Sequence, residues 1–137
     1  MIIDENAGIR ELYALELAGR GYEVTTTGDA SAVEEMIAAL EPDLVLVDPY
    51  IGGEYRWDVV GGIKERNAHL CVLLCTLFVI DDNDPHFHLA DGFVVKSSCT
   101  DELILKVETL LTRKGRGKRK TLKGRERSGE DNDGKED

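Results

Sequence analysis

Short apolar segments alternate with segments of helical periodicity through the first 111 residues of this 137-residue chain. Two of the apolar segments, Leu44–Val47 and Leu70–Thr76, are nearly continuous runs, as expected for strands buried on both faces of a sheet. Because parallel strands need a crossover connection, usually a helix, the alternation indicates an α/β fold with a parallel sheet.

The expected elements alternate as strand and helix until the pattern is interrupted near the end of the domain. Acidic residues and Pro85 lie between Leu77 and Ala90, so any fourth helix is expected to be short or irregular. Right-handed crossovers leave few topologies, and we predict a flavodoxin-like, doubly wound, five-stranded parallel sheet of order 2-1-3-4-5 with helices on both faces. The expected strands are Met1–Ile3, Tyr22–Thr25, Leu44–Val47, Leu70–Thr76 and Phe93–Val95, and the expected helices are Ala7–Arg20, a segment capped by Asp29 or Ser31 that ends before Pro42, Trp57–Arg66 and Asp101–Leu111.

The charge of the chain changes sign after residue 111. Residues 1–111 hold 7 Lys and Arg against 21 Asp and Glu, a net charge of −14, whereas residues 112–137 hold 10 against 6, a net charge of +4. We predict a folded domain over residues 1–111 and a disordered tail, basic and then acidic, over residues 112–137. Any nonspecific contact with nucleic acid falls to the tail, because the acidic body repels polyanions. A solvated tail, or one that lies on the acidic body, is an alternative.

Cysteine usage and hydropathy indicate the compartment. Cys71, Cys75 and Cys99 cannot all pair with one another, and we expect three reduced thiols in buried segments. No apolar run approaches the roughly 18 residues of a membrane span, and no pattern of a secretory signal is present. We therefore expect a cytoplasmic protein without membrane association.

Polar side chains end four of the five expected strands. Asp4 and Glu5 follow the first strand, Asp48 follows the third, Thr76 ends the fourth and Lys96 follows the fifth. In a parallel sheet these ends meet at one edge, where doubly wound folds bind ligands. Three converging carboxylates need a neutralising cation, and oxygen ligands of this kind favour Mg²⁺. Asp48 is then placed to attack phosphorus, while Lys96 and Thr76 stabilise the phosphoryl oxygens.

Four motifs at these strand ends resemble those of the response-regulator receiver domain of two-component signalling, over residues 1–111. They are Ile2–Glu5, Pro42–Asp48, Leu74–Thr76 and Asp91–Lys96. The resemblance implies that Asp48 accepts a phosphoryl group from a histidine kinase or a phosphotransfer protein. It also implies that Mg²⁺ is held by Asp4, Glu5, Asp48 and Tyr50.

The resemblance further implies a conformational switch. Thr76 and Lys96 contact the phosphoryl group in this interpretation, and Thr76 and Phe93 are the residues that move. Plain core packing explains Phe93 equally well. We expect a monomeric, single-domain signalling switch, not an enzyme, that reports to an unidentified downstream protein.

Four positions depart from the family pattern. Glu5 replaces the commoner aspartate, which predicts weaker or displaced Mg²⁺ binding, and Ser97 replaces the proline that commonly follows the lysine. Leu77 replaces a small residue and Tyr50 lies two residues after Asp48, so both are expected to restrict access to the acceptor. The alternative function is a pseudo-receiver that acts as a phosphorylation-independent protein-interaction module.

Histidine and aspartate residues also gather outside this site. They form a candidate Zn²⁺ or Ni²⁺ site, for which a solvated loop is the plainer interpretation. Nearby, Tyr55 and Trp57 are expected to pack a helix or to cover the loop after Asp48. The residues of this cluster are Asp81, Asp82, Asp84, His86 and His88.

Overall fold

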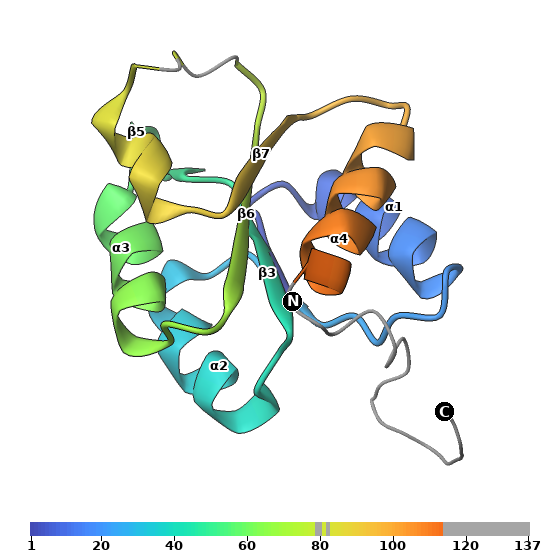
Figure 1. Ribbon diagram of the computed structural model, residues 1–137, viewed down its shortest axis with the longest axis horizontal. Coiled ribbons are helices and arrows are strands. Elements are labelled where there is room, and N and C mark those ends of the chain that lie inside the picture. Colours follow the sequence, from blue (N-terminus) through green and yellow to red (C-terminus); the bar gives the residue numbers. More distant parts are fainter. Residues whose placement is uncertain (79–80, 82, 114–137) are drawn as a thin grey trace.

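The computed structural model describes residues 1–78, 81 and 83–113 of the chain. A five-stranded parallel sheet forms its centre, with the order β2-β1-β3-β6-β7 (Figure 1). Numbered only among themselves, these strands have the order 2-1-3-4-5, so the predicted flavodoxin-like topology is confirmed. The strands are β1 (Ile2–Ile3), β2 (Thr26–Thr27), β3 (Leu44–Val47), β6 (Cys71–Thr76) and β7 (Gly92–Val95).

Helices cover both faces of the sheet. Helices α1 (Ala7–Ala18) and α4 (Asp101–Arg113) lie on one face, and α2 (Val33–Leu40) and α3 (Trp57–Arg66) lie on the other (Figure 1). Asn6 caps α1 by accepting a hydrogen bond from the Ile9 N–H at 3.0 Å. The helix α3 has the predicted bounds, whereas α1 ends two residues before its predicted end and α4 extends two residues beyond it.

Each face of the sheet carries its own hydrophobic core. Leu46 and Leu73 belong to the core beneath α1 and α4, whereas Val45 and Val72 belong to the core beneath α2 and α3. Because successive side chains of a strand point to opposite faces, a strand buried on both faces is apolar at every position. Burying each such side chain contributes about 1.5–3 kcal/mol, so the two central strands give a rigid base to the residues that follow them.

The predicted second strand is displaced along the chain. Strand β2 is Thr26–Thr27 and not Tyr22–Thr25. Its partner β1 has only two residues, which align with Thr26 and Thr27, so the ladder has no room for an earlier segment. Tyr22 and Val24 instead pack against the core beneath α1 and α4.

A small hairpin and two 3₁₀ helices flank the sheet. A small hairpin joins β4 (Tyr50–Ile51) to β5 (Glu54–Tyr55), and its turn contains Gly52 and Gly53 at φ values of 65° and 86°, a region that favours glycine. The sequence indicated only a loop there. The 3₁₀ helix η1 (Ala30–Ala32) precedes α2 and is capped by Asp29, and η2 (Pro85–Leu89) stands where a short or irregular fourth helix was expected.

The three cysteines differ in burial. Cys71 and Cys75 are buried, but Cys99 is exposed, so the prediction of three buried thiols is wrong. Cys99 lies between β7 and α4, where its neighbour Thr100 is the buried residue.

No helix in the described part of the chain is long and apolar enough to cross a membrane. The predictions of disorder and of nucleic-acid contact concern residues 112–137, of which 114–137 lie outside the described residues.

Candidate functional site

The expected strand ends meet at one edge of the sheet. Strands β1 and β3 pair Ile3 with Val47, so Asp4 and Asp48 occupy equivalent positions just beyond them. Strands β6 and β7 pair Thr76 with Val95, and the Lys96 N–H donates to the Thr76 carbonyl at 2.6 Å. The prediction that these side chains share one edge is therefore confirmed by the register of the sheet.

An ammonium group joins two buried carboxylates at this edge. Lys96 Nζ lies 2.6 Å from Asp4 Oδ2 and 2.6 Å from Asp48 Oδ2. The three side chains are 5%, 4% and 8% exposed respectively. The cluster carries one excess negative charge, and burial keeps solvent from screening it.

Backbone groups hold the remaining carboxylate oxygens. Asp48 Oδ1 accepts from the Tyr50 N–H and Asp4 Oδ1 accepts from the Asn6 N–H, both at 2.9 Å. Each carboxylate thus presents Oδ2 to Lys96. The site has a defined geometry because every one of these four oxygens has a donor.

Burial and charge act in opposite directions on the titrating groups. Burial raises the pKa of Asp48, with a further contribution from the Asp4 charge, and this outweighs the lowering by Lys96 and the Tyr50 N–H. Burial alone lowers the pKa of Lys96, but its hydrogen bonds and charge interactions with Asp4 and Asp48 raise it overall. Lys96 is therefore a permanent cation of this site at neutral pH.

The third predicted carboxylate lies apart from the other two. Glu5 is exposed, and its Oε1 accepts from the Gly52 N–H at 2.9 Å in the turn between β4 and β5. Among the described residues, no group of three or more His, Cys, Asp or Glu side chains is arranged to hold a metal ion. Glu5 therefore does not join Asp4 and Asp48 at Lys96 in this structure, since its longer side chain reaches the hairpin backbone, and its place among the metal ligands stays a prediction. The hard oxygens of Asp4 and Asp48 nevertheless fit a divalent cation, and an ammonium ion now holds positive charge between them.

The two residues expected to switch lie near this edge. Thr76 is buried, and its hydroxyl donates to the Phe78 carbonyl. Phe93 pairs with Leu74 across the sheet and is half-buried against the core beneath α2 and α3. Core packing therefore accounts for Phe93 in this conformation.

Exposed residues lie next to the site in the hairpin and directly after β6. Tyr50 is 41% exposed and Leu77 is 64% exposed. The Tyr50 ring begins a row of aromatic contacts that the sequence alone did not indicate. Its centroid lies 5.1 Å from that of Tyr55, which stacks on Trp57 at 5.6 Å, and Trp57 stacks on His86 at 4.5 Å.

The histidine cluster is tied to this aromatic row. His86 Nδ1 lies 2.7 Å from Asp84 Oδ1, and its ring contacts Trp57. Asp82 lies outside the described residues, and the remaining members form no metal-holding group. The candidate Zn²⁺ or Ni²⁺ site finds no support in the part of the chain that the structure describes.

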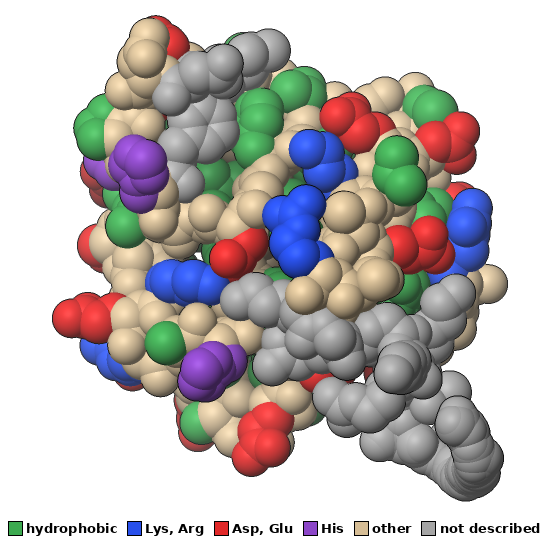
Figure 2. Space-filling view, in the orientation of Figure 1, with side chains coloured by type: hydrophobic (Ala, Val, Ile, Leu, Met, Phe, Trp, Pro, Cys, Tyr) green, Lys and Arg blue, Asp and Glu red, His purple; other side chains and the backbone are tan. Residues whose placement is uncertain are grey.

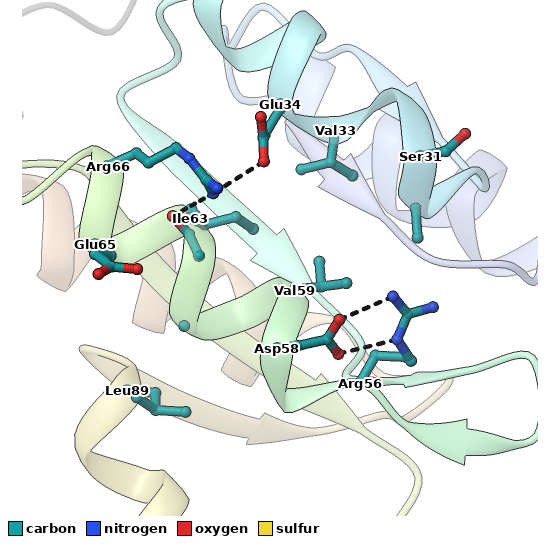
Figure 3. A pocket seen from close by; sticks show the side chains of 13 residues that line it. Ser31, Val33, Glu34, Arg56, Asp58, Val59, Ile63, Glu65, Arg66 and Leu89 are labelled. Atoms are coloured by element: carbon teal, nitrogen blue, oxygen red, sulfur yellow. Dashed lines mark hydrogen bonds and ion pairs between the residues drawn. The ribbon is translucent and has the colours of Figure 1, made fainter.

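A separate hollow of about 860 Å³ lies between α2 and α3 (Figure 3). Its lining includes Arg56 and Arg66, which pair with Asp58 and Glu34, both at 2.9 Å. These pairs satisfy the two cations within the wall, so the hollow has no concentration of charge of one sign. Acidic side chains are likewise spread over the face seen in Figure 2 and form no single patch there.

Comparisons with known proteins agree with this geometry. A family model described as the response regulator receiver domain matches residues 1–108. The response regulator TrrA of Thermotoga maritima, solved in complex with Mg²⁺-BeF, has a TM-score of 0.74 and 32% identity, covering 80% of this chain and 96% of that chain. The same regulator solved with the histidine kinase ThkA has a TM-score of 0.73 and 32% identity, covering 80% of this chain and 95% of that chain.

Curated relatives point to the same family. The probable transcriptional regulatory protein TcrX of Mycobacterium tuberculosis is 26% identical over 117 residues, which are 84% of this chain and 50% of that protein. The phosphate regulon regulator PhoB of Pseudomonas aeruginosa is 26% identical over 121 residues, 85% of this chain and 53% of that protein. The chain spans about half the length of these relatives. The family match and the sheet order together show that this chain belongs to the response regulator receiver domain family of two-component signalling systems.

Proposed function

We propose that the domain accepts a phosphoryl group on Asp48 from a histidine kinase or a phosphotransfer protein and signals its state to a downstream protein. The observation that carries the proposal is the buried arrangement of Asp48 beside Asp4, with Lys96 Nζ 2.6 Å from both carboxylates. A permanent cation next to a nucleophilic carboxylate is suited to the charge that a phosphoryl group brings. The kinase complex of the related TrrA supports the class of partner.

The transfer uses groups that the site already holds. One oxygen of Asp48 attacks phosphorus, and the new O–P bond forms as the N–P bond to the donor histidine breaks. The electron pair of that bond remains on the donor imidazole, and Asp48 becomes a mixed anhydride. Lys96 then neutralises phosphoryl oxygens, while the Tyr50 N–H continues to orient the Asp48 carboxyl.

We propose Mg²⁺ as the cofactor, held by Asp4 and Asp48 with Glu5 and Tyr50 completing the set. When bound, the ion supplies charge neutralisation for the phosphoryl oxygens. Glu5 has to leave the Gly52 N–H, or act through water, to take part. Its present hydrogen bond favours weaker binding than an aspartate gives.

The proposed switch begins at Thr76. Its hydroxyl exchanges the Phe78 carbonyl for a phosphoryl oxygen, which releases the segment after β6. Phe93, now half-buried, then turns further inward. Leu77 and Tyr50 are proposed to slow the arrival of the donor and of water.

The first test is the mass of the intact protein after incubation with acetyl phosphate and Mg²⁺. We expect a phosphoryl adduct in the wild type and none in Asp48→Asn or in the presence of EDTA. An adduct that persists in folded Asp48→Asn contradicts the assignment of Asp48.

A pseudo-receiver is the second candidate function. The observation that favours it is the position of Glu5, which contacts Gly52, so that among the described residues Lys96 pairs with the two carboxylates of Asp4 and Asp48. In that case the folded wild type takes up no phosphoryl group, and Mg²⁺ leaves the emission of Trp57 unchanged.

A further inference from the structure

The loop that follows Lys96 is anchored to helix α1. The Tyr13 hydroxyl donates to the Ser97 carbonyl and accepts from the Ser97 N–H, each at 3.4 Å. At the other end of the loop, the Thr100 hydroxyl donates to Glu16 Oε1 at 3.0 Å. Tyr13 and Glu16 are three residues apart and lie on the same side of α1, so one helix holds both ends of the loop.

The loop depends on these hydrogen bonds because no proline stiffens it. Ser97 keeps a backbone N–H that a proline lacks, and its Oγ accepts from the Cys99 N–H at 3.1 Å. No cis peptide bond occurs among the described residues. The path of the chain after Lys96 is thus set by contacts with neighbouring side chains.

Tyr13 is suited to a structural hydrogen-bonding role. Its side chain is 2% exposed, and burial raises its pKa to about 12. The hydroxyl therefore stays neutral and able to donate and accept at once. Burial also raises the pKa of the neighbouring Cys75 thiol to about 12, so this thiol stays neutral as well.

The backbone of Lys96 is consequently fixed on both sides. The Lys96 N–H donates to the Thr76 carbonyl of β6. The next residue, Ser97, donates its N–H to the Tyr13 hydroxyl of α1. The ammonium has to stay within 2.6 Å of two carboxylate oxygens, so a small shift of the backbone alters both contacts.

We propose that Tyr13 and Glu16 are positioning residues for phosphoryl transfer: they hold the Ser97–Thr100 loop and, through it, the Lys96 ammonium. This inference rests on the proposed function of Asp48. Helix α1 thereby acts on the site through the loop, because the hydrogen-bond and ion-pair partners of the phosphoryl acceptor Asp48 are Tyr50 and Lys96.

The test compares three single variants of the full chain. Tyr13→Phe removes one hydroxyl and keeps the ring in the core, and Thr100→Val removes the hydroxyl that binds Glu16. Tyr22→Phe is the matched control, because Tyr22 packs against the same core beyond the end of α1. The three measurements are the rate of phosphoryl uptake from acetyl phosphate, the Mg²⁺ dissociation constant by calorimetry and the hydrogen exchange rate of the Ser97 amide.

We expect Tyr13→Phe to slow phosphoryl uptake roughly three- to tenfold and to speed exchange at Ser97. Mg²⁺ binding should be unchanged or tighter, because a loosened ammonium competes less for Asp4 and Asp48. General damage to the fold instead weakens Mg²⁺ binding and transfer together. Thr100→Val should show the same pattern more weakly, and Tyr22→Phe should match the wild type.

Three results overturn the proposal: wild-type uptake in Tyr13→Phe, equal slowing in Tyr22→Phe, or Mg²⁺ binding that weakens in proportion to transfer. If Tyr13→Phe does not fold, Thr100→Val decides by the same criteria. If the wild type takes up no phosphoryl group, the proposed function fails. The anchoring of the loop is then decided by Ser97 exchange, with faster exchange in Tyr13→Phe supporting it and unchanged exchange overturning it.

Discussion

The two flanks of Asp48 are built in different ways. On the side of β1 and β7, the Asp4 and Lys96 side chains are buried, and the strands that precede them pack into both hydrophobic cores. Toward the hairpin and the end of β6, Tyr50 is 41% exposed and Leu77 and Phe78 are each 64% exposed. Residues on short turns with little burial open at low cost in free energy, whereas residues held by the core do not. The comparison indicates that the reacting groups are fixed and that the entrance to the site is adaptable.

Lys96→Met is expected to have the largest effect on the stability of the buried flank. It leaves two buried carboxylates without a cation, which costs about 3–5 kcal/mol of unfolding free energy at neutral pH. Without the ammonium, the pKa of Asp48 rises further, so acidification restores part of the loss. Urea unfolding near neutral pH and about two pH units lower measures both effects.

Lys64→Met is the matched control for that experiment. Lys64 Nζ pairs with Asp91 Oδ2 at 2.7 Å, but both side chains are more exposed than those at the site. A smaller loss with little recovery on acidification is expected. If Lys96→Met is as stable as the wild type, the buried flank does not depend on its cation.

Asp48→Asn tests the effect of burial on the charge of the acceptor carboxylate. Burial raises the folded-state pKa of Asp48 above its ordinary value of 3.8, so the folded protein binds this proton more tightly than the unfolded chain does. The protonated carboxyl therefore contributes to the free energy of unfolding below pH 3.8. This contribution is lost as the pH rises from 3.8 through the folded-state pKa. The asparagine variant avoids that loss, and we expect it to be more stable than the wild type by up to about 1 kcal/mol at neutral pH.

Unfolding free energies across this pH window test the sign. The advantage of Asp48→Asn should grow as pH rises. Asp58→Asn is the control, because the hydrogen bond from Arg56 lowers the pKa of Asp58 and reverses the expected slope. A constant difference between Asp48→Asn and the wild type contradicts the prediction.

His86→Ala tests how firmly the aromatic row is held. Loss of the ring that stacks on Trp57 at 4.5 Å should cost about 0.5–1 kcal/mol of stability. Trp57 is the sole tryptophan of the chain, so its emission reports the change directly. His88→Ala, in the same 3₁₀ helix, should leave the emission unaltered. Equal shifts in the two variants argue against a specific Trp57–His86 contact.

Leu77→Ala should have the smallest effect on stability and a visible effect on access. At 64% exposure, the side chain contributes within about 0.5 kcal/mol to the free energy of unfolding. Phosphoryl uptake from acetyl phosphate should rise a few-fold, because the bulky neighbour of Thr76 is gone. Phe78→Ala, equally exposed, serves as the control, and an unchanged rate in Leu77→Ala means that Leu77 does not restrict the donor.

Sequence patterns were most informative where burial is strongest. The runs Leu44–Val47 and Leu70–Thr76 predict β3 and, to within one residue, β6 (Cys71–Thr76), because strands buried on both faces need apolar residues at every position. Strand β2 was displaced because its place depends on pairing with the two residues of β1, and Cys99 was misplaced because a loop residue has no periodicity. The aromatic row was missed because its members join only after the hairpin and η2 come together.

Local spacing in the sequence is sufficient to predict the alternation of strands and helices and the residues that end the strands, because apolar periodicity depends on neighbouring residues. The right-handed crossover rule then leaves few sheet orders. These rules therefore place Asp4, Asp48, Thr76 and Lys96 at one edge. The side-chain directions follow from tertiary contacts: Lys96 lies between two aspartates, and Glu5 turns to the Gly52 N–H. Those choices depend on partners more than 40 residues away in the chain, whose positions no local pattern encodes.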